Sequence, residues 1–403
     1  MRSRPPVSPS ALELSSEALE QTAEAVARHL PAALVPVFTP GFARSHLLLD
    51  EFVFRLTVQV FAESGLAAAA AAGGTPRELL ERADLDPRLE VAVSWLLRHL
   101  AARGVVVRKD DRFRAGDLPA LDPAEVLAEQ RRHDPACLPG YALAETAARD
   151  YPQVLRGRRS GDDVLLAPAR LPLWAAYFSN DNPLYAVNNR VGAVALEAWL
   201  PPGGATVVEL GGGLASGAVA ALERLAAAGR LGALARYHFT ELVPAFLQRG
   251  QRRLQERFGG QVPLAFGRLD MNRPFAEQGV APASVTVVYA VNTLHVARDL
   301  AFTLAEVRAA LEPGGQLVIS EGVRPWPAQT LYPEFIFNLM ETFRAPRLHP
   351  VWRPTGGFLT PEQWTRALGA AGFQDVRVLP DLDRIREVFP TFYVAALRAV
   401  KPS

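Results

Sequence analysis

The second half of the chain alternates short apolar runs with helical stretches, and this alternation constrains the fold more than any other feature. Candidate strands fall at residues 206–210, 237–241, 263–266, 285–290 and 316–321. Helical stretches separate most of them, which is typical of strand–helix–strand units. Two further candidates, at 375–379 and 392–400, are separated by only a short connection. The pattern predicts an α/β domain over residues 201–403, built on a parallel sheet with helices on both faces.

A glycine-rich loop follows the first of these strands, in the stretch VVELGGGLASG. Ligands of open parallel sheets bind beyond the carboxyl ends of the strands, so this loop is a candidate ligand site. A dinucleotide-binding loop has the pattern G-x-G-x-x-G, whereas Gly211, Gly213 and Gly217 give G-x-G-x-x-x-G. The carboxylate of Glu209 would repel a pyrophosphate but attract an ammonium or sulfonium group. The loop is therefore predicted to hold a positively charged ligand.

The same stretch resembles the first glycine-rich motif of class I S-adenosylmethionine (SAM)-dependent methyltransferases. Four later segments resemble that family's motifs and follow in its order: YHFTEL, GRLDMNRPF, VVYAVNTLH and LEPGGQLVISEGV. The resemblance covers residues 201–400 and implies a Rossmann-like, seven-stranded methyltransferase sheet with SAM as the cofactor. Two departures are visible, because the third glycine is displaced and the acid after the second strand is Glu rather than the more frequent Asp.

The resemblance also implies which residues contact the cofactor. Glu241, at the end of YHFTEL, stands where the family's acidic residue holds the ribose hydroxyls. Asp270 and Met271 lie in the segment that resembles the adenine-pocket loop. The full set of cofactor-binding candidates is Glu209, Gly211, Gly213, Glu241, Asp270, Met271 and Asn292.

His295 and Glu321 are the candidate catalytic pair. His295 directly follows the fourth strand, which places it at the ligand edge of the sheet, and histidine is well suited to act as a base near neutral pH. Glu321 closes the next strand, and a carboxylate beside an imidazole fixes its tautomer and stabilises the imidazolium form. The pair resembles the His/Glu pair of polyketide-synthase methyltransferase domains, of both the carbon-methylating and the oxygen-methylating kind.

Other ionisable residues have simpler interpretations. Asp299 is interpreted as an acid at a helix start rather than as an orienting partner of His295. His133 is expected in an exposed loop, and His238 in the core or in an interface. None of these three side chains is a candidate for catalysis.

The N-terminal part has a helical pattern that ends in a hairpin. Thr75 and Glu78 are spaced as a capping box, and a second helix is expected over 87–103, with Gly104 ending it. The stretch VVVRKDDRFRA then predicts two short strands around a polar turn. Helix, helix, hairpin is the order of a winged helix, and this part resembles the dimerisation domain of small-molecule O-methyltransferases.

The expected organisation has four parts. They are a disordered tail at 1–10, a helical and winged-helix domain at 11–115, a helical linker and lid at 116–200, and the SAM-binding domain at 201–403. The segments LWAAYFSNDNPLYAVNNR and LYPEFIFNLMETF are candidates for the lid and the acceptor pocket. Helix capping and core packing are the competing interpretation of both segments.

Composition and charge argue against several classes of function. Lys and Arg number 43 against 42 Asp and Glu, so the net charge of +1 gives no basis for binding nucleic acid or a membrane surface. The apolar stretch 52–72 is interrupted by Arg55, Gln59 and Glu63, which predicts a buried helix and not a membrane span. The single Cys137 forms no internal disulfide and suits a reducing cytoplasm. The seven histidines form no metal-binding pattern.

The sequence therefore predicts a SAM-dependent methyltransferase that acts on a small natural-product acceptor, with His295 as the general base. It leaves open whether carbon or oxygen is methylated, whether the acceptor is free or tethered to a carrier protein, and whether the chain forms a homodimer. The alternative is a non-enzymatic regulator in which a winged helix reads DNA and the SAM-type fold senses a ligand. Acids beside the arginines of the hairpin disfavour DNA reading. The glycine spacing disfavours a nucleotide-dependent oxidoreductase.

Overall fold

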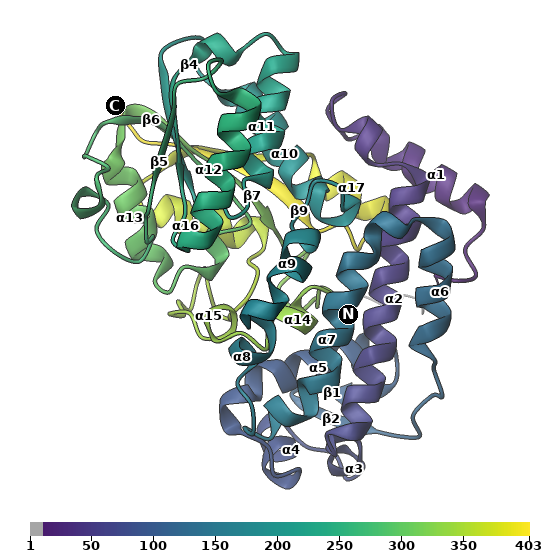
Figure 1. Ribbon diagram of the computed structural model, residues 1–403. Coiled ribbons are helices and arrows are strands. Elements are labelled where there is room, and N and C mark those ends of the chain that lie inside the picture. The colour runs from purple at the N-terminus through teal and green to yellow at the C-terminus, as the bar shows by residue number, and fades with distance from the viewer. Residues whose placement is uncertain (1–10) are drawn as a thin grey trace. The chain divides into compact units, whose positions relative to one another are not determined.

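The protein is described by a computed structural model in which residues 11–403 are placed (Figure 1). The expectation of a disordered tail over residues 1–10 lies outside the described residues. The chain divides into two compact units. We call them the helical unit, which comprises residues 11–24, 38–177 and 326–344, and the sheet unit, which comprises 25–37, 178–325 and 345–403.

A long buried helix, α2 (Pro40–Glu63), forms the centre of the helical unit. It packs against α5, α6 and α7, and most of its side chains are buried, including Arg55. Arg55 is buried because its guanidinium donates to Glu51 at 3.0 Å and to Glu125 at 2.8 Å. No helix among the described residues is long and apolar enough to cross a membrane. The other elements of this unit are most of α1 (Ser16–Ala27), α3 (Leu66–Ala70), α4 (Pro76–Arg82), α5 (Glu90–Ala102), β1 (Val106–Lys109), β2 (Arg112–Ala115), α6 (Pro123–His133), α7 (Leu138–Leu155), α8 (Gly161–Leu165), α9 (Leu171–Tyr177), α14 (Glu334–Phe337) and α15 (Glu341–Arg344).

The helix, helix, hairpin order expected near residue 100 is present. Thr75 and Glu78 form the predicted capping box at the start of α4. Gly104 follows α5 with φ of +78°, a backbone conformation that glycine adopts without strain. Strands β1 and β2 then pair antiparallel, from Val106 with Ala115 to Lys109 with Arg112.

The segment 326–344 leaves the sheet after β7 (Leu311–Gly322) and belongs to the helical unit. Within that unit the Trp95 indole donates to the buried carboxylate of Glu334 at 2.9 Å. The Phe335 ring packs 4.9 Å from the Tyr151 ring. The aromatic side chains of this segment therefore contribute to the core of the helical unit, as in the competing interpretation of LYPEFIFNLMETF.

Glu334 offers a test of this core. Its carboxylate accepts from two buried donors, Trp95 Nε1 and the Leu331 amide, each at 2.9 Å. A buried donor that loses its acceptor costs ~1–3 kcal/mol, so Glu334→Ala is expected to lower the free energy of unfolding by about 3 kcal/mol. Denaturant unfolding followed by tryptophan fluorescence measures this loss. Glu341→Ala, at an exposed position of the same segment, is the control, and equal loss in both variants would contradict the expectation.

The sheet unit contains seven strands, as the sequence resemblance implied. Their order is β5-β4-β3-β6-β7-β9-β8, and all pairs are parallel except those of β9 with β7 and with β8. The strands are β3 (Ala205–Leu210), β4 (Leu234–Thr240), β5 (Leu264–Gly267), β6 (Val285–Val291), β7, β8 (Gln374–Leu379) and β9 (Val394–Val400). The helices are α10 (Pro183–Trp199), α11 (Ser216–Ala227), α12 (Pro244–Phe258), α13 (Leu300–Ala310), α16 (Pro361–Ala370) and α17 (Leu382–Val388).

The strand order reverses at β3, which pairs with both β4 and β6. The chain runs outward from β3 through β4 to β5 and then returns to begin β6 on the other side of β3. Since parallel crossovers are right-handed, this reversal puts α13 on the opposite face of the sheet from α11 and α12. A ligand crevice is expected where the carboxyl ends of β3 and β6 diverge. The loops that follow these two strands are therefore the place to look for the site.

Three features of the chain differ from the sequence expectations. Helix α10 packs against α11, β7 and β9, so the chain from residue 178 onward belongs to the sheet unit and not to a linker that ends at 200. Helix α17 occupies the connection between β8 and β9, which we expected to be only a short connection. His133 does not lie in an exposed loop. It is the last residue of α6, it is half-buried, and its Nε2 lies 3.0 Å from the carbonyl oxygen of Gly41.

Candidate active site

The glycine loop lies between β3 and α11, at the point where the strand order reverses. Gly211 and Gly213 have φ of +60° and +56°, which side chains other than glycine rarely adopt. A Cβ atom on Gly212 would lie 2.1 Å from the Phe239 ring, so this position has no room for a side chain. A Cβ on Gly213 would meet nothing within 4 Å. The loop therefore presents bare backbone to open space at Gly213, where a ligand can approach closely.

Glu241 connects the glycine loop to the end of the neighbouring strand. Its carboxylate accepts from the Gly213 amide at 2.8 Å and from the Val243 amide, also at 2.8 Å. Each carboxylate oxygen can accept a further hydrogen bond. Glu241 is thus fixed beside the loop, with acceptor capacity remaining for a hydroxyl group of a ligand.

Glu209 is buried beneath the same loop, and its surroundings are unusual for a carboxyl group. The Tyr237 hydroxyl donates to Glu209 Oε2 at 3.0 Å, and a Cβ atom on Gly217 would lie 3.3 Å from Oε1. Burial raises the pKa of the Glu209 carboxyl to about 8, and the hydrogen bond from Tyr237 offsets part of this rise. In the absence of a nearby cation, Glu209 is therefore largely neutral at pH 7.

Asp270 and Met271 lie in the loop after β5, at the same edge of the sheet. Asp270 Oδ1 accepts from the backbone and side-chain nitrogens of Asn272, at 2.9 and 3.1 Å. The carbonyl of Met271 accepts from Thr303 Oγ1 at 2.9 Å, which connects the loop to α13. Both residues are half-buried. The Asp270 carboxylate therefore closes its own turn, which fixes the shape of the loop.

His295 and Glu321 are in direct contact. His295 Nδ1 lies 2.7 Å from Glu321 Oε2, and the two residues are 3% and 0% exposed. The other oxygen of Glu321 accepts from the amides of Thr293 and Leu294, at 3.1 and 2.7 Å. Because Nδ1 faces an acceptor, we assign it the proton, so that Nε2 of His295 is the unprotonated ring nitrogen.

The two halves of the candidate site touch each other. A Cβ atom on Gly211 would lie 2.5 Å from the Thr293 side chain, and Thr293 Oγ1 donates to the Gly211 carbonyl at 3.3 Å. Asn292 has φ of +53°, its amide donates to the Ser320 carbonyl at 2.7 Å, and its side chain hydrogen-bonds to Tyr185. The glycine loop after β3 and the catalytic pair after β6 thus form one continuous surface.

Sequence reasoning missed three residues of this site. Tyr185, on α10, contacts Asn292, and the ring of Phe358 lies 4.8 Å from the ring of His295. Arg353 is completely buried, and its guanidinium donates to the carbonyls of His295 and Ala297. No local pattern marks Arg353 or Phe358, which come from a segment distant in sequence from the motif that they support, whereas Tyr185 lies in the segment that was a candidate for the lid or acceptor pocket.

The segment SNDNPLYAVNNR lies beside the glycine loop within the sheet unit. Asn180 Nδ2 donates to the carbonyl of Ser216 at 2.9 Å, and Asn189 donates to Asn180 at 2.7 Å. The carbonyl and side-chain oxygens of Asn188 both lie within hydrogen-bond distance of Ser320 Oγ. Most of these amides therefore hold α10 against the site from inside the sheet unit.

Residues that we did not expect to take part have other roles. Asp299 caps α13 by accepting from the Phe302 amide at 3.2 Å, so it is a helix acid as expected. His238 is half-buried on β4, and Cys137 is buried in the helical unit. Among the described residues, no group of three His, Cys, Asp or Glu side chains could hold a metal ion.

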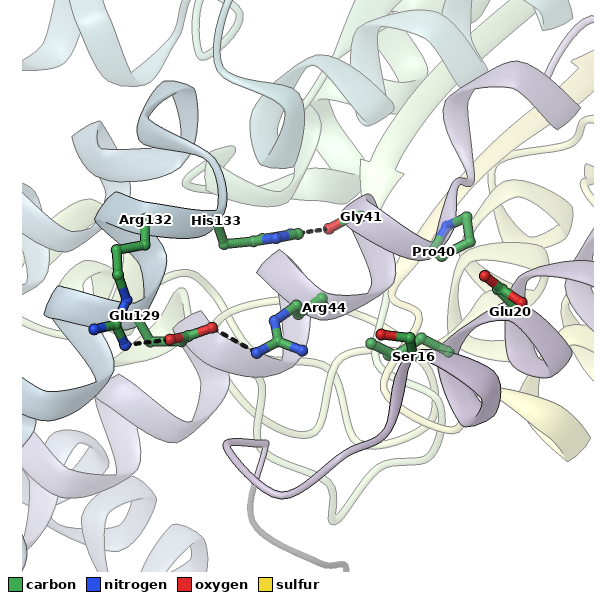
Figure 2. Close-up of a pocket in the computed structure, with 9 residues that line it drawn as sticks. Ser16, Glu20, Pro40, Gly41, Arg44, Glu129, Arg132 and His133 are labelled. Atoms are coloured by element: carbon green, nitrogen blue, oxygen red, sulfur yellow. Dashed lines mark hydrogen bonds and ion pairs between the residues drawn. The ribbon is translucent and has the colours of Figure 1, made fainter.

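A separate pocket of about 340 Å³ lies in the helical unit (Figure 2). Figure 2 shows Glu129 between Arg44 and Arg132, with both guanidinium groups 2.5 Å from its carboxylate. The cations of this pocket are therefore already paired, and it contains none of the candidate site residues. Its lining consists of Ser16, Leu19, Glu20, Pro40, Gly41, Arg44, Glu129, Arg132 and His133.

Comparison with known families identifies the central part of the sheet unit. The sequence of residues 208–317 matches the model of a family described as "Methyltransferase domain". Residues 208–317 form a methyltransferase domain. This match confirms the class that the motifs suggested, the SAM-dependent methyltransferases. The methyltransferase domain includes the glycine loop, Glu241 and His295, and Glu321 follows four residues beyond it.

One curated polyketide synthase and two solved carbon methyltransferases are among the proteins similar to this chain. The highly reducing polyketide synthase 2 of Gibberella zeae is 30% identical over 241 residues, which are 59% of this chain and 9% of that protein. The CurJ carbon methyltransferase has a TM-score of 0.74 and 21% identity, covering 96% of this chain and 99% of its own. The DszA carbon methyltransferase has a TM-score of 0.69 and 22% identity, covering 99% and 98%. These structures share the fold of this chain over nearly its whole length.

The curated relatives are much longer than this chain. The matched region is only 5–11% of their length. They are polyketide synthases by name.

Proposed function

We propose that this chain transfers the methyl group of SAM to a carbon atom of a polyketide-type acyl acceptor, with His295 as the base. The observation that carries this proposal is the buried contact between His295 Nδ1 and Glu321 Oε2, at 2.7 Å, directly beside the glycine loop. A base at the ligand edge of a methyltransferase domain is suited to an acceptor that must lose a proton to react.

The choice of carbon over oxygen rests on the relatives and on acid–base chemistry. The two structural neighbours described above are carbon methyltransferases by name, and the related sequences are polyketide synthases. A saturated carbon atom becomes nucleophilic only after it loses a proton, and a methylene between two carbonyl groups is acidic enough for an imidazole to take that proton. We therefore propose a 3-oxoacyl thioester as the acceptor class, methylated at C2. The proposal extends to an acceptor that is tethered to a carrier protein, since polyketide chains grow as thioesters.

The residues at the loop fit SAM, which would supply a methyl group activated on a positively charged sulfur. Gly213 leaves room for a ligand against the backbone, and Glu241 offers acceptor capacity for ribose hydroxyls. The buried carboxyl of Glu209 is neutral without a ligand and would ionise when a cation is placed nearby. We propose Asp270, Met271 and Asn292 as further contacts in the same cleft.

The catalytic pair would move one proton. In this proposal Nε2 of His295 takes a proton from C2 of the acceptor, and the charge of the imidazolium is stabilised by Glu321 through Nδ1. Burial of both side chains excludes water from the pair, which strengthens the interaction between them. The remaining rate enhancement would come from holding donor and acceptor in line.

Glu241 gives a test of the cofactor site. Glu241→Gln keeps the size of the side chain but removes the charge that strengthens hydrogen bonds to ribose hydroxyls. We expect the Kd for S-adenosylhomocysteine to rise about tenfold or more, equivalent to a loss of about 1.4 kcal/mol. Calorimetric titration measures the change, and Glu256→Gln, at an exposed position on α12, is the control. An unchanged Kd in the Glu241 variant would reject its role at the ribose.

The reaction itself is tested with the full chain and a defined acceptor. Incubation with SAM and the N-acetylcysteamine thioester of a 3-oxo acid should form S-adenosylhomocysteine in equal amount to the methylated thioester. Chromatography with mass detection follows both products. Binding of S-adenosylhomocysteine without any transfer to this acceptor would reject the proposed acceptor class, and absence of binding would reject the enzyme assignment as a whole.

A further inference from the structure

Charged groups hold both ends of the short turn that carries His295. At its start, the Glu321 carboxylate accepts from the amides of Thr293 and Leu294, at 3.1 and 2.7 Å. At its end, the guanidinium of Arg353 donates to the carbonyl of Ala297 at 3.2 Å and to the carbonyl of His295. Free amides at the start of a helical turn favour a negative group, and free carbonyls at its end favour a positive one. The turn is therefore held by the correct charge at each end.

The segment that contributes Arg353 is itself firmly anchored. Backbone hydrogen bonds of 2.9 and 3.0 Å join His349 and Arg353 in both directions, and the Trp352 ring stacks on His349 at 4.3 Å. Arg347 lies 2.7 Å from Asp299, just beyond the turn. We call residues 347–359 the strap, because this segment is fastened along the chain that follows His295.

The strap also limits the orientation of the His295 ring. The Phe358 ring packs against it at 4.8 Å, with 45° between the ring planes. On another edge, Glu321 holds Nδ1 of His295. Movement of the His295 backbone would therefore either break the hydrogen bond to Glu321 or displace Nε2.

A gain in folding stability does not by itself explain why an arginine is buried at position 353. Arg353 is 0% exposed, and its Nε has no hydrogen-bond partner among the described residues. A buried cation with an unused donor costs free energy, and apolar side chains of similar size are often at least as stabilising. The position of the guanidinium is explained by what it holds, which is the backbone at and just after His295, the residue whose Nε2 would accept the proton.

We infer that Arg353 is a positioning residue for the catalytic base. It acts through the carbonyls of His295 and Ala297, and it does not contact the acceptor or the cofactor. This inference rests on the proposed function, since it takes His295 to be the base. A displacement of about 1 Å in a reacting group can lower a rate about 100-fold, so loss of Arg353 should act on turnover and not on binding.

Arg353→Met tests the inference, because methionine fills much of the space but donates no hydrogen bond. With the thioester acceptor, we expect kcat to fall about 100-fold, while KM and the Kd for S-adenosylhomocysteine stay within about twofold. Arg347→Met is the matched control, since it makes the same substitution in the strap at a side chain that is 76% exposed. The control should keep kcat within about twofold of the unmodified protein.

A spectroscopic measurement separates positioning from general damage. Nuclear magnetic resonance with labelled histidine should show an exchange-protected Nδ1 proton that His295→Ala removes. We expect this signal to be lost or broadened in Arg353→Met and retained in Arg347→Met. A fall in kcat with an unchanged signal, a normal kcat, or a loss of binding as large as the loss of kcat would each overturn the inference.

Arg353→Lys covers the case in which the methionine variant does not fold. Lysine keeps the charge and can reach one carbonyl, so we expect kcat to fall measurably but by less than about 100-fold, with binding unchanged. An unchanged kcat in the lysine variant, or loss of folding in both variants, would assign Arg353 to stability alone. Failure of the proposed function is distinguishable from failure of this inference. If the proposed function were wrong, the unmodified protein itself would transfer no methyl group to the thioester.

Discussion

His295→Ala is expected to lower kcat by about 1000-fold while leaving the Kd for S-adenosylhomocysteine within about twofold. The imidazole is the group that would take the acceptor proton, and its partner Glu321 lies 2.7 Å away. The candidate cofactor contacts at Gly213 and Glu241 belong to other strands and stay in place. Loss of turnover without loss of binding is the signature of an interaction made only in the transition state.

The measurement combines steady-state kinetics with calorimetry on the same preparation. His29→Ala is the control, because it removes a half-buried histidine that lies outside the site. Glu321→Gln should give a smaller loss of about 10- to 100-fold, since the amide keeps one acceptor but not the charge that stabilises an imidazolium. Normal turnover in His295→Ala would show that the base lies elsewhere. A parallel loss of affinity would show that His295 holds the cofactor.

Glu209→Gln is expected to make the protein more stable and a poorer binder of SAM. The folded-state pKa of Glu209 is raised to about 8 by burial, above the ordinary value of 4.5. A raised pKa contributes stability that is present below the ordinary value and is lost as pH rises toward 8. At pH 7 the raised pKa of Glu209 therefore lowers the free energy of unfolding of the unmodified protein by about 3 kcal/mol. The Glu209→Gln variant has no ionisable group at this position and avoids this loss. Glutamine keeps an oxygen to accept from Tyr237, so the packing is preserved.

Denaturant unfolding at pH 5 and at pH 8 measures the first effect. The unmodified protein should lose more stability between these values than Glu209→Gln, in the absence of cofactor. Calorimetry of SAM at pH 7 in buffers of different ionisation enthalpy measures the second, because binding of a cation should release a proton from Glu209 and not from the glutamine variant. If the stability of the unmodified protein and of Glu209→Gln changed equally with pH, Glu209 would not be neutral in the folded protein. If the two proteins bound SAM with equal affinity, Glu209 would have no role in recognising positive charge.

The core of the fold and the main site could be predicted from the sequence because their signals are local. Each parallel strand is a short run of apolar residues, and the carboxyl ends of such strands meet at one edge. The glycine loop after Leu210 and the histidine after Val291 therefore had to lie near each other. His295 and Glu321 come into contact because β6 and β7 are neighbours in register, from Val287 with Gln316 to Val291 with Ser320.

The residues that support the site could not be predicted in this way. Arg353 and Phe358 approach His295 from a strap that lies about 60 residues further along the chain and has no periodic pattern. The asparagines before and within α10 were expected either in a pocket or in caps and core packing, and the sequence did not show that they hydrogen-bond to Ser216, Ser320 and each other. His133 was wrongly predicted to lie in an exposed loop. A proline-containing turn follows the helix that His133 ends, and this composition is typical of a loop.

The position of the transferred methyl group tests the central claim most directly. The full chain is incubated with SAM that carries a deuterated methyl group and with the N-acetylcysteamine thioester of a 3-oxo acid, and the product is located by carbon magnetic resonance. We expect the label at C2 of the acyl chain, formed by the unmodified protein and not by His295→Ala. A label on oxygen, or equal labelling by the His295 variant, would contradict the account of a histidine-assisted carbon methyltransferase.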